Sequence, residues 1–123
     1  MTEMKKPYIA GYSGLAQGII GQACEDYMRY CKKIQNMVAD KDKYIAKMIK
    51  EDKKKKVPIL NSKKTIEEEY KTTLSMYKYG LKEIEDFFRG EWYQALTDLD
   101  GEYMLNGLKA KAEERYGIDV DCV

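Results

Sequence analysis

Two stretches of the sequence repeat apolar residues at every third or fourth position, which is the spacing of one face of an α-helix. The first stripe keeps its phase past Asp40, and the second keeps its phase through Gly80. Two helices that are each apolar on one side bury those sides together by packing antiparallel. The stripes therefore predict an all-α fold, a long antiparallel helical hairpin with one short and one medium C-terminal helix packed on it. The first stripe is Ile19, Ala23, Tyr27, Cys31, Ile34, Val38, Ile45, Met48 and Ile49, and the second is Ile66, Tyr70, Leu74, Tyr77, Leu81, Ile84 and Phe88.

The first helix is expected over residues 14–54, after an irregular N-terminal segment, 1–13. Since the apolar spacing continues across Asp40, one continuous helix is favoured over two helices broken at that residue, although a kink there is the main alternative.

A lysine-rich hairpin tip is expected over residues 55–62, because Pro58 cannot continue a helix. The second helix follows over residues 63–89. The candidate signals for its start are Asn61 or Ser62 as the cap, and Thr65 with Glu68 as a capping box.

A C-terminal helical corner is expected over residues 91–117. Gly90 interrupts the second helix, a short helix covers 91–96, and Asp98 or Asp100 caps a last helix that runs to Gly117. The tail, 118–123, is expected to be loose. The side chains that should fold the corner onto the hairpin are Phe87, Phe88, Trp92 and Leu96.

The composition indicates a single domain, 1–123, with 44% hydrophobic and 35% charged residues. No apolar run approaches the length of about 20 residues that a membrane span needs, so no membrane partner is expected. The start of the chain lacks the long apolar stretch of a secretory signal, which favours a cytoplasmic location. The three cysteines, Cys24, Cys31 and Cys122, are expected to be reduced and structural.

The chain has no histidine, which removes the usual general base and the commonest metal ligand. The segment DLDGE does not fit an EF-hand in any register, so Asp98 and Asp100 are interpreted as helix caps. Ser13, in GYSGL, has no histidine to activate it. No catalytic, cofactor-binding or metal-binding residue is therefore assigned, and no cofactor is expected.

Gly14, Gly18 and Gly21 lie along one line of the first helix, beside its apolar stripe. A glycine in a helix interior costs about 1 kcal/mol relative to alanine, so three of them suggest a close approach by something. Packing against the last helix is the simpler interpretation, and a contact with a second chain is the alternative.

Lysines concentrate around the predicted tip, and no arginine or aromatic residue lies among them. A nucleic-acid backbone or another anionic partner could bind there, with an affinity that depends on salt. A tip that only aids solubility is the equal alternative, because base stacking and bidentate phosphate contacts are not available. The candidate anion-binding residues are Lys53, Lys54, Lys55, Lys56, Lys63 and Lys64.

Tyrosine is in excess, with 11 tyrosines against 2 phenylalanines. Several lie outside the stripes, and amphipathic rings of this kind suit protein interfaces. They predict a partner surface formed by the N-terminal segment and the C-terminal corner, and a hairpin of this size also leaves apolar surface for a homo-oligomer. The candidate partner-binding residues are Tyr8, Tyr12, Gly14, Gly18, Gly21, Tyr93 and Tyr103.

Two segments, GIIGQACEDYMRYCKKI (18–34) and EIEDFFRGEWYQALTDLDGEYMLNGLKAKAE (83–113), resemble a group of small, uncharacterised prophage proteins of Firmicutes. The shared pattern is an acidic Asp-Tyr helix followed by FFRS-x-W-x-x-L-T-x-x-D-G-E-Y-L-I-x-K-L. Gly90 stands where that pattern has serine, and residues 35–82 form a hairpin that the shorter relatives lack. The resemblance covers about 40% of the chain and implies a small helical protein of phage origin, with no established activity or site residues.

The function expected from these features is a non-enzymatic, phage-derived binding protein that occludes or sequesters a host factor. An inhibitor of an antiviral defence system, of the anti-CRISPR type, is one example, in the cytoplasm of an infected or lysogenic bacterial host. The alternative is a nucleic-acid-associated phage protein that uses the lysine-rich tip.

Overall fold

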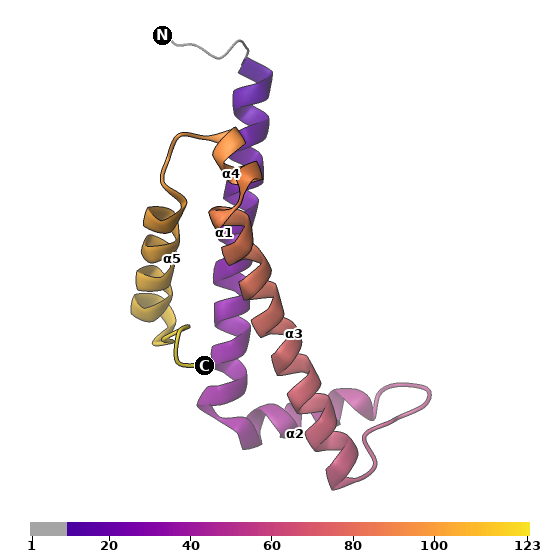
Figure 1. Cartoon of the computed structure of the whole chain (residues 1–123). Helices are drawn as coiled ribbons and strands as arrows, with labels where there is room; N and C mark the ends of the chain where they lie inside the picture. Colours follow the sequence, from indigo (N-terminus) through magenta and orange to yellow (C-terminus); the bar gives the residue numbers. More distant parts are fainter. Residues whose placement is uncertain (1–9) are drawn as a thin grey trace.

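The structure, a computed structural model, describes residues 10–123, and of residues 10–13 it describes the backbone alone. Among these residues the fold is all-α, as predicted, and contains no strand. The five helices are α1 (Ala10–Ala39), α2 (Lys41–Asp52), α3 (Lys63–Arg89), α4 (Glu91–Leu96) and α5 (Gly101–Tyr116) (Figure 1).

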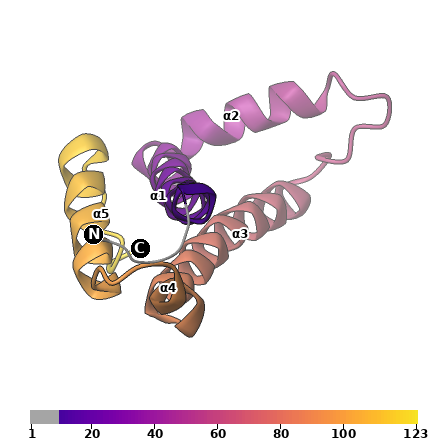
Figure 2. The ribbon, with the colours of Figure 1, turned by 90° about the horizontal axis from the view of Figure 1, so that it is seen from above.

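The two long helices, α1 and α3, pack together, and α5 packs against both of them. Figure 1 shows α1 and α3 running in opposite directions, and Figure 2 shows α5 beside α1 with α4 at the end of α3. This packing places one hydrophobic core between α1, α3 and α5. Its buried members are Tyr27, Cys31, Ile34, Leu81, Phe88, Tyr93, Leu105, Leu108, Ala112 and Ile118.

The predicted continuous helix over residues 14–54 is wrong, because the chain breaks at Asp40. The backbone of Asp40 leaves the helical region (φ −147°, ψ 87°), and its carboxylate accepts the N–H of Lys43 at 3.1 Å as an N-cap of α2. From this residue α2 turns away from the axis of α1 (Figures 1 and 2). The apolar spacing is the same on both sides of the break, so periodicity alone did not reveal it.

Tyr70 of α3 supports the break. Its buried hydroxyl donates a 2.7 Å hydrogen bond to the carbonyl of Met37, which in a continuous helix would accept from Lys41. The ring of Tyr44, on α2, packs edge-on against the Tyr70 ring, and Lys41 lies 4.9 Å from the same ring while pairing with Glu67. One side chain thus connects the end of α1, the start of α2 and the first half of α3.

The second helix begins and ends where the sequence predicts. Ser62 caps α3, and its capping-box partner is Thr65 itself rather than the pair of Thr65 with Glu68. The helix continues through Gly80, and Gly90 ends it. At Gly80 the ring of Tyr30 occupies the space that a Cβ would need, so the glycine admits a close approach of α1.

The C-terminal corner also has the predicted elements. Asp100 caps α5 by accepting the N–H of Glu102 at 3.0 Å, and Gly117 ends it in the left-handed conformation, φ 70°. The adjacent Gly101 lies so close to the end of α3 that a Cβ would overlap the Phe88 carbonyl. The start of α5 therefore packs directly on the backbone of α3.

The prediction of a loose C-terminal tail is wrong. Ile118 is fully buried in the core, and Val120 packs against it. Asp121 pairs with Lys109 of α5 at 3.1 Å, and the N–H of Cys122 donates to the carbonyl of Asp119. The tail thus folds back as the last piece of the core.

Candidate interaction surfaces

The N-terminal part of the predicted partner surface is only partly described. Tyr8 and the side chain of Tyr12 lie outside the described residues. Gly14, Gly18 and Gly21 are exposed, and a Cβ on any of them would meet no atom of the described chain within 4 Å. The expected packing of α5 on this line is therefore wrong, and a contact with a second chain stays a prediction.

For two neighbouring aromatic residues of α4, Trp92 and Tyr93, the observed exposure is the reverse of the prediction. Tyr93, predicted to bind a partner, is fully buried between Phe87 and Phe88, with ring centroids 5.7 and 5.1 Å away. Trp92, predicted to fold the corner onto the hairpin, is 61% exposed, and its ring lies nearly perpendicular to that of Phe87, at 5.5 Å between centroids. Gly90 is extended between α3 and α4 (φ −95°, ψ 173°), and α4 follows it with Tyr93 on its inner side and Trp92 on its outer side. Tyr103, at the start of α5, is exposed as expected.

Exposed apolar side chains gather along one flank of α3. Met76 and Tyr79 are 61% and 63% exposed, and Phe87 follows at helical spacing. Phe87 in turn carries the exposed Trp92 on its edge, at 5.5 Å between ring centroids. We call this surface the α3 flank; its residues are Tyr30, Met76, Tyr79, Gly80, Phe87 and Trp92.

A shallow groove runs along the α3 flank where Tyr30 of α1 lies against Gly80. Met76 and Tyr79 line it together with the polar side chains Lys71, Thr72, Ser75 and Glu83. The Tyr30 ring packs against the ring of Tyr77, at 6.0 Å between centroids. The groove is open, shallow and mostly apolar, which suits a protein surface better than an enclosed small molecule.

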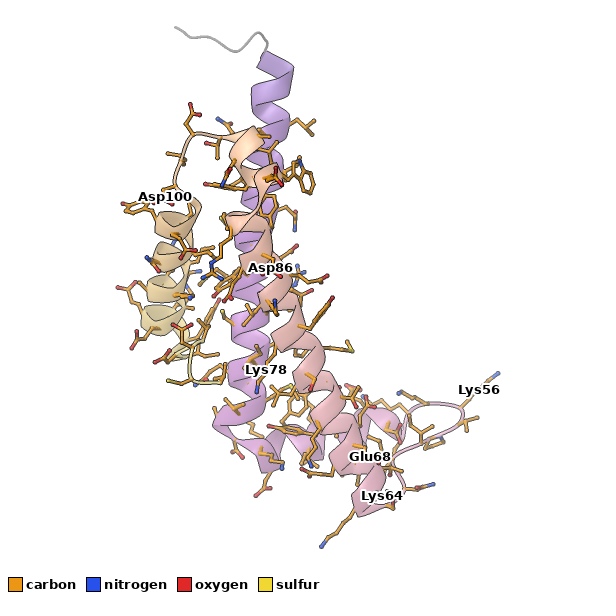
Figure 3. The ribbon with its side chains drawn as sticks, viewed as in Figure 1. Lys56, Lys64, Glu68, Lys78, Asp86 and Asp100 are labelled. Atoms are coloured by element: carbon orange, nitrogen blue, oxygen red, sulfur yellow. The ribbon has the colours of Figure 1, made fainter. Side chains whose placement is uncertain are left out.

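The lysine tip, residues 50–64, is the second exposed surface. All of its lysines are exposed, including the six that the sequence singles out. Figure 3 shows Lys56 at the far end of the loop and Lys64 pointing away from the helices. Two of the lysines make ion pairs inside the segment, Lys54 with Glu51 at 3.2 Å and Lys55 with Asp52 at 3.8 Å. The remaining positive charge faces outward.

Asp52 fixes the shape of this loop. Its carboxylate is buried at the end of α2 and accepts the N–H groups of Ile59 at 3.1 Å and Leu60 at 3.0 Å. These backbone hydrogen bonds, with help from Lys55, hold the pKa of Asp52 below its usual range. The tip is therefore a folded loop with a charged anchor.

The polar groups inside the core are structural. The Tyr27 hydroxyl donates to Glu85 at 3.2 Å, and burial together with that carboxylate raises the pKa of Tyr27. Burial also raises the pKa of the Cys31 thiol to about 12, and that of Cys24 above its usual value. Both thiols are protonated at neutral pH and are poor nucleophiles.

The third thiol, Cys122, donates to Asp119 at 3.3 Å, and this bond raises its pKa. In the described part of the chain, His, Cys, Asp and Glu side chains do not gather in a group of three that could hold a metal ion. Among residues 10–123, no helix is both long and apolar enough to cross a bilayer.

Comparisons of the chain with models of protein families, with curated proteins and with solved structures found no match. The resemblance to prophage proteins therefore stays a prediction.

Sequence reasoning missed three features of these surfaces. The α3 flank had a visible signal, since Met76, Tyr79 and Phe87 repeat at helical spacing on the side away from the main stripe. The exposure of Trp92 had no signal in the sequence, because it depends on the direction of the chain after Gly90. The role of Asp52 was also hidden, since a carboxylate among lysines resembles ordinary surface charge.

Proposed function

We propose that this chain is a small, non-enzymatic binding protein that covers a surface of a protein partner with its α3 flank. In a prophage setting the partner would be a host factor that the protein occludes or sequesters, such as a component of an antiviral defence system. The observation that carries the proposal is the exposure of Met76 and Tyr79 on one face of α3, which Phe87 shares by helical spacing, together with the exposed Trp92 beside the Phe87 ring.

The residue types support an interface. Tryptophan, tyrosine and methionine are enriched in the cores of protein interfaces, and tryptophan and tyrosine supply most of the residues that dominate binding energy. Leaving three such side chains in water forgoes the free energy that their burial would provide, about 1.5 to 3 kcal/mol for a side chain of this size. A partner that covers them would recover this free energy.

The scaffold under the flank supports the same function. Met76 and Tyr79 stand on a helix whose opposite side is held by the core, and Trp92 rests on Phe87. Side chains on packed helices lose little freedom on binding, so less of the binding energy is spent on ordering them.

The test is capture of partners from a lysate of a lysogenic host by the wild-type chain and two variants. The flank variant carries Met76→Ser, Tyr79→Ala and Trp92→Ala. The matched control carries Leu99→Ser and Tyr103→Ala, two exposed residues of the corner that lie outside the flank. The proposal expects a partner that the wild type and the control retain and the flank variant loses.

A direct readout checks the same contact with the purified partner. Trp92 is the single tryptophan of the chain, so its fluorescence reports on the flank alone. Binding at the flank should shift its emission to shorter wavelength. Loss of binding in the control but not in the flank variant would assign the interface to the corner instead and would overturn the proposal.

A further inference from the structure

The lysine tip differs in charge from the rest of the molecule. Residues 50–64 contain seven lysines and two acidic residues, a net charge of +5, whereas the whole chain has a net charge of +1. The remainder of the chain is therefore negative overall. An extended anionic surface would attract the tip and repel the rest, which would orient the molecule with its tip towards that surface.

Two aliphatic side chains are exposed within this positive loop. Val57 is 74% and Ile59 is 53% exposed, on either side of Pro58. The N–H groups of Ile59 and Leu60 donate to the Asp52 carboxylate, and of these two residues Leu60 is half-buried and Ile59 is exposed. The loop thus presents two exposed aliphatic side chains with exposed lysines on both sides of them in the sequence.

From these two observations we infer that the lysine tip docks on the surface of an anionic lipid bilayer. The lysines lie among the phosphate groups, and Val57 and Ile59 enter the boundary between headgroups and acyl chains. Clusters of four to eight basic residues are typical of segments that bind anionic lipids, and aliphatic side chains add to that binding by entering the boundary between headgroups and acyl chains.

A nucleic-acid backbone fits the same loop less well. A phosphodiester chain offers nothing for two exposed aliphatic side chains, and residues 50–64 have neither an arginine nor an aromatic ring for bases. The sequence predicts no membrane partner, because no segment is long and apolar enough to span a membrane. Docking at the surface needs no such segment, and the exposure of Val57 and Ile59 could not be seen in the sequence.

The inference is independent of the proposed function, because the tip lies at the start of α3 and the α3 flank lies in its second half. Failure of partner binding by the flank variant therefore says nothing about the tip. Failure of lipid binding by a tip variant likewise leaves the flank untested.

The experiment is co-sedimentation of the full chain with vesicles of phosphatidylcholine alone and with vesicles that also contain phosphatidylglycerol. The charge variant changes Lys53, Lys54, Lys55 and Lys56 to Gln. Its matched control makes the same number of Lys→Gln changes at exposed positions elsewhere, Lys32, Lys71, Lys78 and Lys111. The two variants have the same net charge, and circular dichroism checks that both keep their helices.

The expected result is binding to the anionic vesicles only. The charge variant should lose this binding by about a hundredfold or more, since each lysine near an anionic surface contributes roughly fivefold. The control should bind like the wild type. Equal losses in the charge variant and the control would mean that only net charge matters, and this would overturn the inference.

A second variant, Val57→Ser with Ile59→Ser, separates lipid from nucleic acid. On anionic vesicles it should bind roughly tenfold more weakly than the wild type, because two aliphatic side chains no longer enter the boundary. Unchanged vesicle binding by this variant, together with binding of a DNA duplex that the charge variant alone abolishes, would assign the tip to nucleic acid and overturn the inference.

A fluorescent probe tests insertion itself. Val57→Trp in a Trp92→Phe background places the only tryptophan at the tip. Its emission should shift to shorter wavelength with anionic vesicles and stay unchanged with neutral ones. No shift under conditions in which the protein sediments with the vesicles would exclude entry of the loop into the boundary.

Discussion

The two ends of α3 are held in different ways. Around its second half, α1, α4, α5 and the tail meet in one core with fully buried rings and aliphatic side chains. Its first half contacts α2 and the end of α1, where Tyr70 donates to the carbonyl of Met37, and the one buried residue of α2 is Asp52. One end is held by apolar packing and the other by a few directed hydrogen bonds, so substitutions at the two ends should have different consequences.

The largest effect is expected at the packed end, from Gly101→Ala. A Cβ at this position would overlap the carbonyl of Phe88, so α5 must move off α3. We expect the free energy of unfolding to fall by about 3 kcal/mol, the upper range for an inserted methyl group in a packed core. Urea denaturation followed by circular dichroism measures it.

Gly107→Ala is the matched control, since it lies in the same helix and its Cβ would meet no atom of the described chain within 4 Å. It should be neutral or stabilising by up to about 1 kcal/mol. Equal stability of both variants would mean that the start of α5 does not rest on α3, and the contrast between the two ends would weaken.

At the junction of the two ends, Tyr70→Phe should lower the free energy of unfolding by about 1 to 2 kcal/mol, because it leaves the carbonyl of Met37 without its donor. Tyr44→Phe, on the neighbouring ring, removes a hydroxyl that makes no hydrogen bond in the described structure, and should change stability by less than about 0.5 kcal/mol. If the two variants unfold alike in urea, the hydroxyl of Tyr70 does not support the break at Asp40.

At the packed end, removing the hydroxyl group should have different effects on stability at two buried tyrosines, Tyr93 and Tyr27. The hydroxyl of Tyr93 has no hydrogen-bond partner among the described residues, so Tyr93→Phe should leave stability unchanged or raise it by about 1 kcal/mol. The hydroxyl of Tyr27 donates to Glu85, so Tyr27→Phe should lower it by about 1 kcal/mol. A thermal-melt comparison of the two variants decides the sign, and a clear loss in Tyr93→Phe would show that its hydroxyl has a partner.

The smallest effect is local and lies at the tip. Backbone N–H groups hold the pKa of Asp52 below its unfolded value of about 4. The stabilisation of the loop by this carboxylate is therefore fully present above that value and is lost as the pH falls through the folded-state pKa. Hydrogen exchange at the amides of Ile59 and Leu60, corrected for intrinsic rates, should lose protection over this range while the amides of α3 keep theirs.

Asp52→Asn provides the comparison for this measurement. It should show weak protection at those two amides at every pH, because the charged acceptor is gone. Protection that is the same in the variant and the wild type would mean that the loop is held by something other than Asp52.

The helices and their apolar faces were predictable from the sequence. The angles at which successive helices follow one another were not. The spacing of apolar residues, with a cap at Ser62 and an interruption at Gly90, located α3, and Asp100 and Gly117 marked the start and the end of α5 as expected. The break at Asp40 was not predicted, because an aspartate with the same sequence neighbours can lie on the surface of a helix or cap the next helix. The burial of Tyr93 and of Ile118 was not predicted either, because both depend on contacts between segments that are distant in the sequence.

The candidate surfaces were predictable to a similar degree. Lysine clustering is visible in any sequence, so the positions of the tip residues followed directly. Which tyrosines are exposed did not follow, because an aromatic residue outside an apolar stripe can still be buried by a different element, as α4 does with Tyr93. Burial at a corner depends on the direction of the turn before it, and the neighbouring residues in the sequence do not fix that direction.

The unbroken course of α3 fixes how the two surfaces face relative to each other. The lysine tip leads into its first residue, and the groove beside Tyr79 lies along its middle, so both surfaces lie on one helix of 27 residues. Each residue of such a helix turns the next by about 100° and advances it by about 1.5 Å. The angle between the two surfaces about the helix axis therefore depends on the number of residues between them, and one residue inserted between Glu68 and Thr72 would change that angle by about 100°.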